Sequence, residues 1–140
     1  MYLLDTNVVS EIRKPRPHGA VLQWIASVSP QDLAVPAVVI AELQAGAEIT
    51  RRQDPTKAAE LEAWIDEILR TFSDIGMDGP TFRHWAHLMA GKTPGLAADA
   101  MIAATARLYN YVVATRNVRD FLALGAEVFN PFTYHSEDLV

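Results

Sequence analysis

Apolar and polar residues follow one another along this chain in a way that predicts short strands separated by helices. The strand candidates are short, mainly apolar runs at residues 2–4, 32–36, 74–77, 111–114 and 126–129. Apolar residues recur at helical spacing in residues 18–29, 37–47, 61–72 and 96–108. Strands that alternate with helices predict a parallel sheet with helices on both faces, and ligands bind such sheets at the carboxyl ends of the strands.

Local signals place several helix ends. A helix should follow the first strand, capped by Thr6 or Asn7. Asp78, two residues before Pro80, is typical of a helix start, and GKTPG at residues 91–95 should end that helix. A last helix should open near Asn117, and the tail after residue 131 is left unassigned.

The composition fits one compact domain spanning residues 1–140, because 50% of the 140 residues are hydrophobic and 21% are charged. With no cysteine, a metal could take only oxygen or imidazole ligands, and a reducing cytoplasm is expected.

The N-terminus reaches Asp5 too early for a signal peptide. The longest uncharged apolar stretch, residues 33–41, is far short of the roughly 20 residues that cross a bilayer. The net charge of −5 argues against a broadly basic nucleic-acid-binding surface, unless the acids hold divalent cations.

Two acids interrupt helices that are otherwise apolar. Asp99 is the only acid of the helix expected at residues 96–108, and Glu42 is the only charged residue of the helix expected at residues 37–47. Because burying an unpaired carboxylate is costly, each should have a cation, a hydrogen-bond network or a raised pKa to compensate. The alternatives are a neutral or capping carboxyl for Asp99 and a salt bridge for Glu42.

Two further acids follow strands. Asp5 ends the first strand, and Asp120 comes after the strand and loop YVVATRN. Taken alone, Asp5 could cap the next helix, and Asp120 could interact with a helix dipole. Together with Asp99 and Glu42, however, these acids could share one crevice, where clustered carboxylates favour hard divalent ions such as Mg²⁺ or Mn²⁺.

Four blocks of this sequence resemble those of a known family. The blocks are DTNVVSE at 5–11, AELQAG at 41–46, DAMIAATA at 99–106 and TRNVRDF at 115–121, and each carries one of the four acids. In this order they resemble the motifs of PIN-domain toxins of the VapC type, and most of all its FitB-like branch. The resemblance covers nearly the whole chain and implies an α/β fold: a three-layer α/β/α PIN-like domain with a central, mainly parallel sheet.

The resemblance also assigns roles to residues. It makes Asp5, Glu42, Asp99 and Asp120 the catalytic, metal-binding quartet, with Asp5 and Asp99 as the direct ligands. The polar residues that accompany the quartet are Thr6, Thr115 and Asn117, which would hydrogen-bond the ligands or metal-bound water; ordinary helix capping is the alternative. Arg116 and Arg119 flank Asp120 and could contact RNA phosphates, unless they are simply solvated surface.

The implied activity is that of an endoribonuclease toxin of a type II toxin–antitoxin system. Mg²⁺, for which Mn²⁺ should substitute, would polarise the phosphate and activate a water that hydrolyses the RNA phosphodiester. The implied partners are the RNA substrate and a VapB-type antitoxin, whose tail would cover the acidic crevice and through which the complex would reach operator DNA. A homodimer is also implied, with an exposed part of the helices in residues 18–50 as its expected face, and no membrane partner is expected.

Other functions fit the residues less well. His84 and His87 share a helix at a spacing of three, but the apolar stripe beside them predicts that both face water. A phosphatase resembling the haloacid dehalogenases needs a second Asp where Asn7 stands, so its general acid is missing. A receiver-like acidic metal-binding signalling module would need paired early acids and a late Lys, which the sequence does not supply. A PIN nuclease of housekeeping RNA processing is the remaining alternative.

Overall fold

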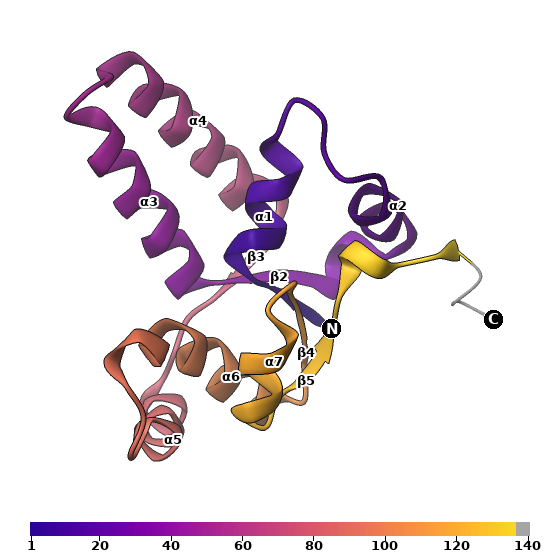
Figure 1. The fold of residues 1–140 in the computed structure, drawn as a ribbon, viewed down its shortest axis with the longest axis vertical. Helices are drawn as coiled ribbons and strands as arrows, with labels where there is room; N and C mark the ends of the chain where they lie inside the picture. The colour runs from indigo at the N-terminus through magenta and orange to yellow at the C-terminus, as the bar shows by residue number, and fades with distance from the viewer. Residues whose placement is uncertain (137–140) are drawn as a thin grey trace.

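The computed structural model describes residues 1–136 and shows a parallel sheet between layers of helices (Figure 1). The strands are β1 (Tyr2–Leu4), β2 (Leu33–Pro36), β3 (Ser73–Ile75), β4 (Val112–Ala114) and β5 (Glu127–Phe129). The helices are α1 (Thr6–Arg13), α2 (Gly19–Ser27), α3 (Ala37–Arg51), α4 (Pro55–Thr71), α5 (Gly79–Met89), α6 (Ala97–Tyr109) and α7 (Val118–Ala123). Short 3-10 turns are η1 (Pro30–Asp32), η2 (Pro94–Leu96) and η3 (Pro131–Thr133). The predicted three-layer α/β/α class is confirmed.

The order of the strands creates a switch point beside β1. The sheet runs β3-β2-β1-β4-β5, and each neighbouring pair is parallel. The chain builds β2 and β3 on one side of β1 and then returns to add β4 and β5 on the other side. In such sheets a crevice opens at the carboxyl ends of the two strands where the order reverses. Asp5 directly follows β1 and Thr115 directly follows β4, so the topology places both residues at this crevice.

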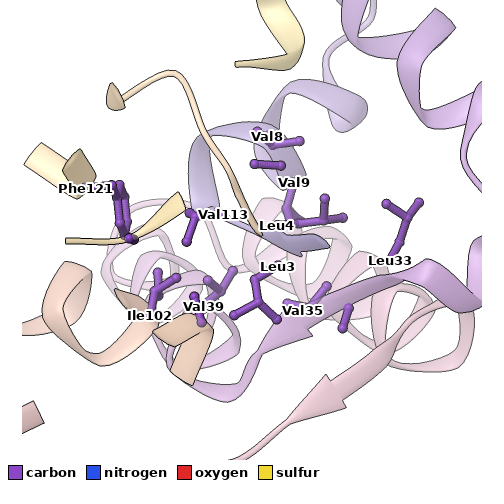
Figure 2. Close-up of a cluster of buried hydrophobic side chains, with 14 of the residues drawn as sticks. Leu3, Leu4, Val8, Val9, Leu33, Val35, Val39, Ile102, Val113 and Phe121 are labelled. Atoms are coloured by element: carbon purple, nitrogen blue, oxygen red, sulfur yellow. The ribbon is translucent and has the colours of Figure 1, made fainter. Parts of the chain in front are cut away.

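The two faces of β1 fix the helices that flank the crevice. Successive strand residues point to opposite faces of a sheet. Figure 2 shows Leu4 on the side of Val8 of α1, whereas Leu3 lies on the side of Val39 of α3 and Ile102 of α6. All five side chains are fully buried. Because each such burial contributes about 1.5–3 kcal/mol, these helices are anchored to the central strand.

Several helix ends differ from the hydrophobic pattern. Helix α3 continues to Arg51 rather than ending at Ala47, and α4 begins at Pro55 rather than at residue 61. Figure 1 shows the α3–α4 pair extending away from the sheet, so its outer turns carry no apolar signal. Capping defines the true start of α4, because the Asp54 carboxylate accepts the Lys57 backbone N–H at 3.0 Å. The N-cap of α1 is Asp5 itself, so the expectation of Thr6 or Asn7 as the cap was wrong.

Within residues 1–136, no helix combines the length and the apolar character that crossing a membrane requires.

Candidate active site

Asp5 is held at the end of β1 by hydrogen bonds from three residues. Its side chain is 5% exposed. One carboxylate oxygen accepts the Thr6 backbone N–H at 2.7 Å. The other accepts the Thr115 hydroxyl at 2.7 Å and the Asn7 side-chain amide at 3.1 Å. Burial raises the pKa of Asp5, although these hydrogen bonds oppose the rise, so its ionised form is costly without a nearby cation.

The loop after β4 connects Asp5 to Asp99. The Thr115 hydroxyl oxygen accepts the Asn117 backbone N–H at 2.9 Å, and the Asn117 side-chain amide donates to Asp99 Oδ2 at 3.2 Å. Asp99 lies in the first turn of α6 and is half-buried, as is Asp120 of α7. A single loop therefore orients two carboxylates that stand 94 positions apart in the sequence.

Glu42 reaches the same region from α3. The Thr6 hydroxyl donates to Glu42 Oε1 at 2.9 Å, which ties the start of α1 to α3. Glu42 is exposed, so the prediction that it interrupts a buried apolar helix was wrong. The small apolar residues beside it, Ala41 and Ala45, are exposed as well, so the helix is alanine-rich without being interior.

The electrostatics of Asp99 place all four acids near one another. Burial, followed by the charges of Asp5, Glu42 and Asp120 in that order, raises the pKa of Asp99 to about 6. Because charge interactions weaken with distance and screening, the three other carboxylates lie near enough to Asp99 to act on it. The crevice therefore concentrates negative charge at the switch point.

This region has the donor chemistry of a site for a hard divalent cation. The acids offer carboxylate oxygens, which are ligands that Mg²⁺ and Mn²⁺ prefer. Within the described residues 1–136, however, no group of three or more acidic, histidine or cysteine side chains is arranged to hold a metal ion. The acids thus fit a divalent cation by donor type and charge. Their side chains do not converge on a single metal position in this structure.

Sequence reasoning missed two polar residues of α1. Asn7 was predicted as a possible helix cap and not as a site residue. Its amide donates to Asp5 and Thr115, and its Oδ1 accepts the Arg116 backbone N–H at 3.1 Å. Glu11 is only 5% exposed and was not singled out. Both stand inside the DTNVVSE block, which was the one available signal. Arg116 and Arg119 are exposed at the edge of the loop and on α7.

The histidines of α5 differ in part from the prediction. His87 is exposed as expected, but His84 is half-buried, and its Nε2 is a buried atom without a hydrogen-bond partner among residues 1–136. Burial lowers the pKa of His84, and the nearby Arg107 and His87 act in the same direction. The apolar stripe on α5 is less dominant than expected, because Phe82 is itself exposed.

Comparisons with known proteins match nearly the whole chain. The family model described as "PIN domain" matches residues 2–126. The toxin FitB of Neisseria gonorrhoeae is 35% identical over 138 residues, covering 94% of this chain and 99% of FitB. The VapC ribonuclease Y4jK of Sinorhizobium fredii is 36% identical over 143 residues, covering 94% of this chain and 98% of that protein. The solved structure of FitAB bound to an IR36 DNA fragment superposes with a TM-score of 0.83 at 33% identity, covering 96% of this chain and 98% of that one.

Proposed function

This chain belongs to the PIN-domain family, and from that premise we propose that it is a divalent-metal-dependent endoribonuclease acting as the toxin of a toxin–antitoxin pair. The observation that carries the proposal is the position of Asp99. It lies at the switch point of the sheet, where burial and three further carboxylates raise its pKa to about 6. A protein gains nothing in stability from gathering acids in this way, so a bound cation is the best reason for it.

The side chains divide into those that would hold the metal and those that position them. Asp5 and Asp99 would bind Mg²⁺ or Mn²⁺ directly, and Glu42 and Asp120 would complete or orient the site. Thr115 fixes one oxygen of Asp5 at 2.7 Å, and Asn117 holds Asp99 at 3.2 Å. When bound, the metal would neutralise phosphate charge and lower the pKa of an attacking water.

The first test is cleavage of a single-stranded RNA with Mn²⁺ and with EDTA. We expect cleavage with the metal, none with EDTA, and at least about a 100-fold loss in Asp99→Asn, because even residues that only support metal ligands cost 10–100-fold when removed. Asp78→Asn is the matched control, since Asp78 is likewise an aspartate at a helix start but caps α5, whereas Asp99 lies in the first turn of α6. Full activity in EDTA, or equal activity of Asp99→Asn and the control, would refute the proposal.

The toxin role is tested by expressing the chain alone. Growth should stop, and co-expression of a small antitoxin from the neighbouring open reading frame should restore it. The Asp99→Asn variant should be harmless at the same protein level. Unchanged growth with active enzyme in the cell would instead favour housekeeping RNA processing.

A groove beside the acids supports an antitoxin of the VapB type as the partner. It has a volume of about 320 Å³, begins at Thr6 and Glu42, and runs between α1, α3 and α4 to Leu61 and Trp64. An extended tail bound there would pass over the acidic crevice, and DNA would be bound through the antitoxin. Co-purification of the two proteins, with inhibition of RNA cleavage at a ratio of one to one, is the expected result.

Self-association through residues 18–50 remains part of the proposal. Leu22 and Ile49 lie in this stretch and are 42% and 69% exposed, which suits a protein interface. Ile49→Glu should shift the chain toward the monomer in sedimentation velocity experiments, while Leu122→Glu on α7 should not.

A further inference from the structure

Glu11 is a buried acid that the acidic crevice does not use. It lies on α1, 5% exposed, and its Oε1 is 3.2 Å from Lys14 Nζ and 3.8 Å from Arg116 Nη2. The two cationic side chains are themselves 59% and 55% exposed. A buried carboxylate is tolerated when cations compensate it, and here two cations surround one anion. The cluster therefore presents a surplus of positive charge on a chain whose net charge is −5.

Arg116 is also fixed from its other side. Its guanidinium carbon lies 3.7 Å from the centroid of the Phe132 ring, which is nearly buried and packs edge-on against His18. The Arg116 backbone N–H donates to Asn7 at 3.1 Å. Within residues 1–136 the guanidinium group itself donates no hydrogen bond, because Glu11 lies beyond hydrogen-bond distance. Its planar set of donors is thus oriented and still available to a ligand.

The position of this cluster relates it to the crevice. Arg116 stands between Thr115, which holds Asp5, and Asn117, which holds Asp99. The backbone that carries the Arg116 side chain therefore borders the residues that hold Asp5 and Asp99. An anionic polymer that passes over the crevice needs cationic contacts beside it, and Arg is suited to phosphate oxygens in particular.

We infer that Lys14 and Arg116 form a binding site for an RNA phosphate at the border of the acidic crevice, and that Glu11 and Phe132 are positioning residues for Arg116. The inference rests on the proposed ribonuclease activity and extends it. It identifies Glu11 and Phe132 as the residues that hold the Arg116 guanidinium. It also adds Lys14 to the residues proposed to contact the substrate.

The experiment measures kcat and KM for a single-stranded RNA, with Mn²⁺, across a series of salt concentrations. Arg116→Ala and Lys14→Ala should raise KM more than they lower kcat, and each should reduce the slope of log affinity against log salt by about 0.7. Arg83→Ala is the control, because Arg83 is an exposed cation on α5. Arg116→Lys should not restore the wild-type KM, since Lys lacks the planar donors.

Glu11→Gln separates positioning from net charge. If only the sum of charges mattered, removing this carboxylate would strengthen RNA binding. If Glu11 positions Arg116, KM should rise although the surface has become more positive. Mn²⁺ binding by Arg116→Ala and by Lys14→Ala should stay near wild type. A wild-type enzyme that cleaves RNA while both alanine variants behave like Arg83→Ala would overturn this inference alone. A wild-type protein that neither binds nor cleaves RNA would overturn the proposed function.

Discussion

Asp5 and Asp78 perform the same local task in two regions of the molecule with opposite electrostatic results. Each is the N-cap of a helix, Asp5 for α1 and Asp78 for α5. Each accepts a backbone N–H and a threonine hydroxyl, from Thr115 at 2.7 Å in one region and from Thr81 at 2.6 Å in the other. Nevertheless the pKa of Asp5 is raised, whereas the pKa of Asp78 is lowered.

Burial and neighbouring charge account for the difference. Asp78 is exposed, so hydrogen bonds from Thr81 dominate and favour its ionised form, and the Tyr109 hydroxyl adds another at 2.8 Å. Asp5 is buried, and desolvation outweighs three hydrogen bonds. An aspartate that only caps a helix ionises easily, whereas burial disfavours the ionised form of Asp5, and a bound cation would offset this effect. The comparison therefore separates a structural cap from a residue with a further role.

The largest expected effect concerns the two threonines that donate to these caps. Thr115→Val removes the hydroxyl from Asp5 and the acceptor from the Asn117 backbone N–H, so RNA cleavage should fall about 10–100-fold. Thr81→Val removes the corresponding hydroxyl from Asp78 and should leave cleavage unchanged, while lowering the free energy of unfolding by about 0.5–1.5 kcal/mol. Steady-state kinetics and urea unfolding of both variants measure this. Equal losses of activity would remove the distinction between the two regions.

A smaller effect is expected in the stability of the metal-free protein. Burial, followed by the other acids, raises the pKa of Asp99 from 3.8 to about 6. The folded state then binds more protons than the unfolded state, so the free energy of unfolding should fall as pH rises from about 4 through about 6. Because Asp99 is half exposed and partly screened, we expect a loss of about 1–2 kcal/mol.

Asp99→Asn tests this pH dependence. The variant should be more stable than wild type near neutral pH without metal, and it should lack most of the decline. Urea unfolding in EDTA on either side of the pKa of Asp99 provides the measurement. A wild-type protein whose stability is flat across this range, or matches the variant throughout, would show that the acids do not interact as described.

Asp78 should show the smallest effect and the opposite sign. Because its folded pKa is lowered, its contribution to stability is present above the unfolded pKa of about 4 and is lost as pH falls through the folded value. Asp78→Asn should therefore remove a part of the acid sensitivity of the melting temperature and leave RNA cleavage unchanged. A loss of stability in Asp78→Asn that is confined to acidic pH, or an acid sensitivity equal to that of wild type, would contradict this sign.

The sequence predicted those features that depend on local pattern. Alternating strands and helices fixed the fold class, and an acid in an apolar helix singled out Asp99. Glu42 was singled out by the same reasoning, but alanines are common on exposed helices too, and it proved to be exposed. Apolar periodicity also missed the outer turns of α3 and α4, where the two helices pack against each other rather than against the core.

The remaining features depend on contacts between distant residues. Asn7 and Thr115 lie 108 positions apart, and the partners Glu11 and Arg116 lie 105 positions apart. No periodicity or capping rule relates such pairs, because the strand order brings them together only after folding. The sequence does not show that β1 pairs with β4. Once this pairing is known, the position of the crevice and of the loop after β4 can be inferred from the sequence.

The most direct test of the central claim, that the four acids form one divalent-cation site, is a Mn²⁺ titration followed by electron paramagnetic resonance of the free ion. Wild-type protein and Asp78→Asn should bind Mn²⁺ saturably with equal affinity, and Asp99→Asn should bind it at least about tenfold more weakly. If all three proteins bind Mn²⁺ equally, or if wild type does not bind it, the acids at the switch point do not form a metal site.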